Sequence, residues 1–186
     1  MTPEADRLRQ EKLRLRREIR SAAVLPGEYR RWASERITEQ VLALESYRKA
    51  GTVMAFMSLP EEPDTREIIR DAAEAGKTVL LPRCISPEEM IALPFTGWEH
   101  LESGWLGIRE PEMPAEGTEI PEPELILVPC VAASPDGKRL GHGAGYYDRF
   151  LAGRKAETVC LCFRRLARED IPAGPQDIRM DRVITD

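Results

Sequence analysis

One glycine-rich stretch carries the residues best suited to bind a ligand. Residues 139–151 read RLGHGAGYYDRFL, with Gly141, Gly143 and Gly145 alternating just before a helix predicted over 146–152. Because glycine has no side chain, the backbone N–H groups of such a loop can approach a ligand closely, and a helix N-terminus adds partial positive charge. The stretch indicates a phosphate-binding loop, but three alternating glycines alone are equally compatible with a tight turn.

Basic residues are concentrated near the N-terminus, in a segment predicted to be helical. Residues 7–20 contain seven Lys or Arg and two Glu, so this segment is positive although the whole chain has a net charge of −5. Lys12 and Arg16 are four residues apart, and Arg9 and Arg20 extend the same helix face. Like charges at this spacing destabilise a helix by about 0.2–0.5 kcal/mol, and a bound anion would relieve the repulsion. The alternative is an ordinary solvated basic face.

Predicted strands and helices alternate along the rest of the chain. Continuous apolar runs such as 125–128 are typical of strands buried on both faces of a sheet. The alternation predicts an α/β fold: a mainly parallel sheet flanked by helices, in a three-layer, Rossmann-like single domain over residues 1–186. Strands are expected at 52–59, 78–81 (ending at Pro82), 90–95 (an edge strand), 125–128, 158–163 and 182–185. Helices are expected at 6–22, 28–46, 65–75 (ended by Gly76) and 146–152, and a surface loop at 111–123.

Composition disfavours several classes of protein. With 42% hydrophobic and 32% charged residues and no apolar run long enough to span a bilayer, we expect a cytoplasmic chain without a membrane partner. The acidic balance argues against general nucleic-acid binding. The four cysteines lack the spacing of a redox or zinc motif and are expected to be reduced thiols. We expect a monomer that binds small molecules. The cysteines are Cys84, Cys130, Cys160 and Cys162.

The 139–151 stretch closely resembles the signature of the 5-formyltetrahydrofolate cyclo-ligase family, also called methenyltetrahydrofolate synthetases. Four further elements resemble those of the family, in the same order along the chain. Five matches in order are much more specific than any one of them. The four are KLRLR at 12–16, the 56–65 segment with Glu62 and Asp64-Thr65, GIREP at 107–111, and an ending made of 171–177 and 180–185.

The resemblance implies an α/β enzyme that uses ATP and Mg²⁺ to convert 5-formyltetrahydrofolate to 5,10-methenyltetrahydrofolate, releasing ADP and phosphate. Phosphorylation of the formyl oxygen makes it a leaving group, and N10 of the folate then attacks the activated carbon. Such a reaction needs charge neutralisation and alignment more than a protein nucleophile. The sequence offers no evident catalytic triad, and Lys12, Arg16 and Arg139 are expected to act electrostatically.

The resemblance also implies which residues bind each ligand. For Mg²⁺, it implies the carboxylates of Asp148 and Asp177, since this ion usually takes one or two carboxylates together with phosphates and water. The implied folate-binding residues are Arg16, Leu59, Asp64, His142, Gly143, Ala144, Gly145 and Tyr146. The implied ATP-binding residues are Lys12, Leu13, Arg14, Leu15, Arg16, Arg139, Leu140, Gly141, His142, Gly143, Ala144, Gly145, Tyr146 and Tyr147.

Ordinary structural roles stay open for several of these residues. Asp148 could balance the charge of a helix N-terminus, and Asp177 could be a plain loop acid. Asp64 is also a good helix N-cap. Candidates for core positions are Leu59 and either Tyr146 or Tyr147.

Three positions depart from the family pattern and are expected to change the shape or affinity of the site. His142 stands where many relatives carry arginine or tyrosine, Cys130 replaces a common glycine, and Ala133-Ser134 replaces a common Phe-Asp pair. Two other function classes also stay open. One is a sugar-phosphate isomerase or CoA transferase on a related fold, and the other is a non-catalytic nucleotide-binding module.

Overall fold

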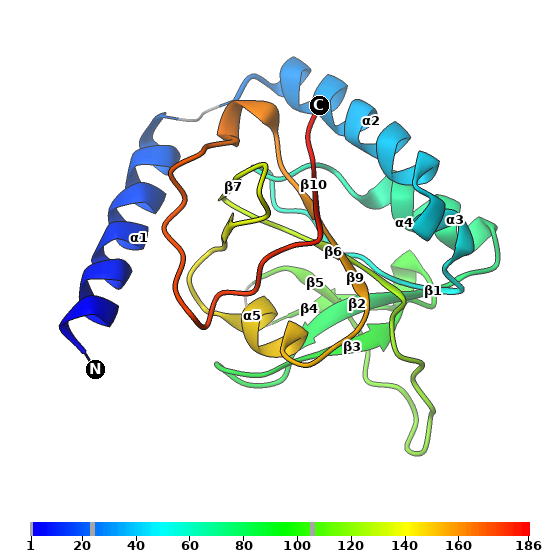
Figure 1. Cartoon of the computed structure of the whole chain (residues 1–186). Helices are drawn as coiled ribbons and strands as arrows, with labels where there is room; N and C mark the ends of the chain where they lie inside the picture. Colours follow the sequence, from blue (N-terminus) through cyan, green and yellow to red (C-terminus); the bar gives the residue numbers. More distant parts are fainter. Residues whose placement is uncertain (1, 23–24, 105–106) are drawn as a thin grey trace.

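The central sheet is built from apolar segments that are buried on both faces. In the computed structural model, which describes residues 2–22, 25–104 and 107–186, six strands form a sheet in the order β10-β9-β6-β1-β2-β3 (Figure 1). Neighbouring strands run parallel from β10 to β2, and β3 pairs antiparallel with β2. The predicted α/β fold with a mainly parallel sheet and an edge strand near residue 90 is confirmed. The strands are β1 (Thr52–Met54), β2 (Thr78–Cys84), β3 (Met90–Pro94), β6 (Leu125–Val128), β9 (Glu157–Leu161) and β10 (Arg182–Ile184).

The direction of the chain through the sheet reverses between β1 and β6. From β1 the chain moves through α4 (Arg66–Glu74) to β2, whereas from β6 it moves through α5 (Tyr146–Leu151) to β9 on the other side. Because crossover connections are right-handed, α4 and α5 lie on opposite faces of the sheet. Figure 1 shows α4 beside α2 and α3, away from α5. Ligands of open α/β sheets bind at such a reversal, beyond the carboxyl ends of the strands.

Two strand boundaries differ from the prediction. The predicted strand 52–59 ends at Met54, because the carbonyl of Phe56 accepts a hydrogen bond from the Thr65 hydroxyl instead of joining a neighbouring strand. β2 continues past Pro82 to Cys84, although proline was predicted to end it. The carbonyl of Leu80 faces β1, so the nitrogen of Pro82 points to the same side, where β1 has already left the ladder. No ladder hydrogen bond is lost there.

The helices follow the predictions except in the second helical segment. α1 (Pro3–Ala22) begins slightly earlier than expected. The predicted helix 28–46 is instead α2 (Gly27–Ala43) followed by α3 (Glu45–Lys49), because Leu44 between them is extended. Gly76 follows α4, and its N–H bonds to the carbonyl of Ala73 as expected for a helix end. Within the described ranges, no helix is both long and apolar enough to cross a membrane.

Two small hairpins were not predicted. β4 (Leu101–Ser103) pairs with β5 (Arg109–Pro111), and β7 (Ala132–Ala133) pairs with β8 (Arg139–Leu140). Strands of two or three residues are too short to show an alternating hydrophobic pattern. The second hairpin turns at 135–137, and it places Arg139 beside the end of β6. Two 3₁₀ turns complete the chain, at Trp98–His100 and Arg164–Leu166.

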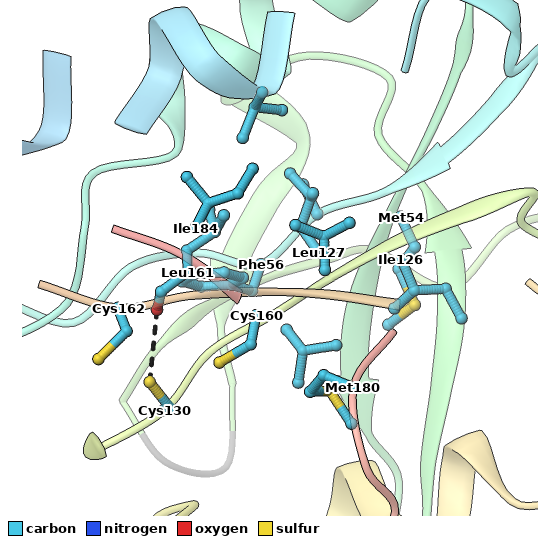
Figure 2. Close-up of a cluster of buried hydrophobic side chains, with 14 of the residues drawn as sticks. Met54, Phe56, Ile126, Leu127, Cys130, Cys160, Leu161, Cys162, Met180 and Ile184 are labelled. Atoms are coloured by element: carbon cyan, nitrogen blue, oxygen red, sulfur yellow. Dashed lines mark hydrogen bonds between the residues drawn. The ribbon is translucent and has the colours of Figure 1, made fainter. Parts of the chain in front are cut away.

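Three cysteines lie together in the core (Figure 2): Cys160 is in β9, and Cys130 and Cys162 follow the ends of β6 and β9. Cys130, Cys160 and Cys162 are at most 4% exposed, and the thiol of Cys130 donates to the carbonyl of Leu161 at 3.4 Å. Hydrogen bonds with Cys160 and Cys162, together with burial, raise the pKa of the Cys130 thiol well above its usual value. All four cysteines are free, as predicted.

Candidate functional site

A cavity of about 1540 Å³ opens beyond the carboxyl ends of β1, β2 and β6, where the sheet order reverses. Phe56 and Met57 follow β1, Cys84 ends β2 and Pro129 follows β6, and all four line the cavity. α1, the glycine-rich loop and residues 173–177 form the other walls. Ligand pockets usually measure about 300–1,000 Å³, so this cavity has room for two substrates side by side.

The glycine-rich loop forms one wall through residues 141–145. Gly143 and Gly145 have φ angles of 116° and 73°, which residues with side chains rarely adopt. Gly145 leads directly into α5, where the N–H of Arg149 donates to the carbonyl of Gly145 at 3.1 Å. The glycines therefore serve the tight turn and also keep this wall open to a ligand.

α1 forms the wall next to the glycine-rich loop and brings its basic face to the cavity. Leu15 and Ile19 are 3% and 7% exposed and anchor the helix on the core. Lys12 forms an ion pair with Asp177, and Nε of Arg16 donates to the carbonyl of Gly141 at 2.7 Å. Burial, and then the nearby charge of Arg20, lower the pKa of the Arg16 guanidinium. The middle of the basic stripe predicted from the sequence is therefore packed against the cavity walls, whereas Arg9 and Arg20 at its ends are exposed.

Arg139 extends from β8 into the floor of the cavity. It is 8% exposed, and its Nη atoms donate to the carbonyl of Pro129 at 3.3 Å and to Asp148 at 3.1 Å. Its Nε has no hydrogen-bond partner among the described residues, and neither has the buried hydroxyl of Tyr147. The guanidinium lies over the Tyr147 ring, 5.6 Å from its centre. Two unsatisfied buried donors in one cavity suit a ligand rich in oxygen.

Both predicted metal ligands line the cavity, and both are paired with protein donors. Asp148 accepts from Arg139 and from the N–H of Ile178 at 3.2 Å, while Asp177 accepts from Lys12 and from the N–H of Gly174 at 2.5 Å. Within the described residues, no group of three or more His, Cys, Asp or Glu side chains is placed to hold a metal. The pair fits Mg²⁺ only together with phosphate oxygens, which is how this ion usually binds.

Glu62 and His142 face each other across a narrow part of the cavity wall. Oε1 of Glu62 lies 2.8 Å from Nε2 of His142, and the N–H of Leu59 donates to Oε2 at 2.8 Å. The side chain of Glu62 is 3% exposed. Glu62 is thus a buried carboxylate in the lining of the cavity.

Several residues implied by the sequence do not reach the cavity. Asp64 lies outside it, and its carboxylate accepts hydrogen bonds at 3.0 Å from the side chain and from the backbone N–H of Arg66, the first residue of α4. Arg66 holds the pKa of the Asp64 carboxyl below its usual value. Leu15 is in the core because it lies on the face of α1 opposite the solvent. The implied ligand-binding residues outside the cavity are Leu13, Arg14, Leu15, Leu140 and Asp64, whereas Leu59, Tyr146 and Tyr147 line it.

Met57 and Glu62 are among the cavity residues that were not assigned a role from the sequence. Met57 and Glu62 both lie in the 56–65 segment that the resemblance singled out, but Leu59 and Asp64 were chosen in their place. Residues two or three apart in an irregular segment point in unrelated directions. Only the fold, which turns Asp64 towards Arg66 and Glu62 towards His142, separates the two acids.

Comparison with known proteins gives consistent results. Residues 2–186 match the family model described as the 5-formyltetrahydrofolate cyclo-ligase family. The 5-formyltetrahydrofolate cyclo-ligase of Mus musculus is 30% identical over 178 residues, covering 86% of this chain and 85% of the relative. That of Mycolicibacterium smegmatis is 36% identical over 142 residues, covering 72% and 73%.

A solved structure shares the fold. The NMR structure of 5,10-methenyltetrahydrofolate synthetase from Aquifex aeolicus aligns with a TM-score of 0.79 and 28% sequence identity. The alignment covers 92% of this chain and 88% of the other. The overall fold of this chain therefore has a counterpart in a protein of known structure.

Proposed function

Because the chain belongs to the 5-formyltetrahydrofolate cyclo-ligase family, we propose that it converts 5-formyltetrahydrofolate to 5,10-methenyltetrahydrofolate with ATP as the phosphoryl donor. The observation that carries the proposal is the meeting of three cations in one cavity. Lys12 and Arg16 come from α1 and Arg139 comes from β8, more than 120 residues later, and all line the cavity beside the glycine-rich loop. Free thiols support a reducing compartment, and we place the enzyme in the cytoplasm.

In the proposed reaction the protein positions two substrates and balances charge. The formyl oxygen takes the terminal phosphoryl group of ATP and becomes a leaving group, and N10 of the folate then attacks the formyl carbon. Lys12, Arg16 and Arg139 would bind the phosphates and neutralise charge in the transition state. Asp148 and Asp177 would hold Mg²⁺, which supplies further charge neutralisation on the phosphate oxygens.

The folate would occupy the part of the cavity near the sheet. Phe56, Met57 and Leu59 provide an apolar wall for a flat ring, and Glu62 offers a buried carboxylate to its N–H groups. We therefore assign the acidic folate contact to Glu62 rather than to Asp64. This arrangement puts the formyl group between the apolar wall and the cations.

Measuring ADP release with and without 5-formyltetrahydrofolate tests this function against its rivals. The proposal predicts ADP release that depends on the folate. A sugar-phosphate isomerase or CoA transferase would release no ADP in either case, and a binding module would bind ATP without turnover. ADP release at the same rate without folate would also contradict the proposal.

Asp177→Asn and Asp148→Asn are each expected to raise the Mg²⁺ concentration needed for half-maximal ADP release by about tenfold or more, because each removes one carboxylate ligand but keeps its shape. Asp170→Asn is the control, since Asp170 pairs with Arg168 outside the cavity. It should leave the Mg²⁺ requirement unchanged. Wild-type Mg²⁺ dependence in either test variant would show that the replaced aspartate does not bind the metal and has a structural role only.

A further inference from the structure

His142 and Glu62 form a hydrogen-bonded pair whose two members differ in exposure. The Glu62 side chain is 3% exposed, whereas that of His142 is 37% exposed, and both line the cavity. The separation of Nε2 and Oε1 is 2.8 Å. A buried carboxylate therefore holds an imidazole that still reaches the space for the substrates.

This contact fixes where the imidazole carries its proton. An ionised carboxylate only accepts hydrogen bonds, so Nε2 of His142 is protonated and Nδ1 of the neutral ring has a free lone pair. The carboxylate is itself held, because the N–H of Leu59 donates to its other oxygen. A basic nitrogen oriented by an anchored carboxylate is the usual arrangement of a protein general base.

The proposed ring closure needs a proton acceptor. N10 of the folate carries a hydrogen when it attacks the phosphorylated formyl carbon. The bond between N10 and that carbon forms, the bond between the carbon and the phosphate oxygen breaks, and the N10 proton must leave before the cationic methenyl product exists. This requirement rests on the function proposed above.

We propose that His142 accepts the N10 proton through Nδ1, with Glu62 as its positioning residue. The imidazolium that forms stays paired with the Glu62 carboxylate and later releases its proton to water. The released phosphate carries away the formyl oxygen. Atoms and charge balance without any further reactant.

The charged and titratable groups around His142 favour this assignment. Arg16 from α1 bonds to the carbonyl of Gly141, next to His142, and as a cation it cannot accept a proton. Burial and then the Glu62 charge raise the pKa of the Tyr147 hydroxyl on α5, which keeps its proton. The competing acceptor is Glu110, a buried carboxylate that lines the cavity and accepts from the N–H of Cys84 at 3.3 Å.

The assignment predicts how the rate depends on pH. An imidazolium cannot accept a proton, so kcat should fall once the pH is low enough to protonate the imidazole. Removing the Glu62 charge takes away stabilisation of the imidazolium. In Glu62→Gln this fall in kcat at low pH, the acid limb of the pH profile, should therefore move to lower pH.

His142→Gln is the main test, because its amide nitrogen can keep the bond to Glu62 but cannot take up a proton. We expect kcat to fall about a hundredfold, with little change in KM, and the acid limb to disappear. His100→Gln is the matched control. His100 is the other histidine of the chain, half-exposed near Glu99 and Glu112 and outside the cavity lining, and its loss should change neither kcat nor the pH profile.

A second readout does not depend on turnover. With two histidines in the chain, the imidazole NMR signals of His142 and His100 can be assigned by comparing the two variants. The His142 signal should shift when 5-formyltetrahydrofolate binds, and the His100 signal should not.

The possible outcomes distinguish failure of the His142 assignment from failure of the proposed function. Wild-type turnover with an unchanged acid limb in folded His142→Gln protein would overturn the assignment of His142 alone. Loss of the acid limb in Glu110→Gln, but not in His142→Gln, would move the role to Glu110. Absence of turnover in the wild-type protein would overturn the proposed function and this inference with it.

Discussion

Arg16→Ala is expected to weaken ATP binding by about tenfold or more, and Arg17→Ala is expected to leave it close to the wild-type value. A charge-assisted hydrogen bond contributes about 1.5–3 kcal/mol, and every 1.4 kcal/mol is a tenfold change in affinity. Arg16 lines the cavity and bonds to the glycine-rich loop, so it is positioned to contact phosphate. The measurement is the Kd of ATP by calorimetry.

Arg17 is the matched control because it has the same charge one residue away. Successive helix residues point about 100° apart, and Arg17 is exposed and absent from the cavity lining. General electrostatic attraction would affect both variants alike and mainly at low salt. Equal, small losses at moderate ionic strength would show that the basic face of α1 does not bind the nucleotide.

Glu62→Gln is expected to weaken folate binding by about tenfold or more, because the buried carboxylate that would accept N–H groups of the ring is replaced by an amide. The expected result for Asp64→Asn is wild-type folate affinity. Asp64 lies outside the cavity, and the amide oxygen of asparagine can still accept from the N–H of Arg66. The measurement is the Kd of 5-formyltetrahydrofolate without ATP.

Thermal unfolding of both variants provides the control for this comparison. Each replacement keeps the shape of the side chain, so both proteins should unfold cooperatively near the wild-type temperature. The opposite pattern of affinities, with Asp64→Asn impaired and Glu62→Gln normal, would restore the folate contact that the sequence resemblance implied.

The sheet could be predicted because its strands are unusually apolar. The four residues of β6 are each 0% exposed, and runs of this kind are recognisable without knowledge of their neighbours. The end of β1 could not be predicted, since it depends on a hydrogen bond between Phe56 and Thr65 that only the folded chain brings together. The break at Leu44 likewise leaves no proline or glycine in the sequence to mark it.

The site could be predicted in outline but not in its pairings. The glycine-rich loop and the basic segment were each visible as local patterns. Their contact, in which Arg16 bonds to Gly141, joins residues 125 positions apart. Lys12 also pairs with Asp177, far along the chain, and Arg139 pairs with Asp148, so the cations and carboxylates that line the cavity hold each other.

These pairings have a consequence for binding. In the proposed function, phosphate that bonds to Lys12 would take this cation from Asp177 and would leave a carboxylate for a metal ion. Binding of ATP together with Mg²⁺ would then keep the charge balance, whereas binding of ATP alone would not.

The most direct test of the proposed function is the formation of the methenyl product itself. Purified protein with 5-formyltetrahydrofolate, ATP and Mg²⁺ should show a rising near-ultraviolet absorbance from 5,10-methenyltetrahydrofolate, and omission of ATP should abolish it. A sample that unfolds cooperatively on heating, and is therefore folded, but gives no increase in absorbance with all three components present would contradict the assignment of this cavity to folate ring closure.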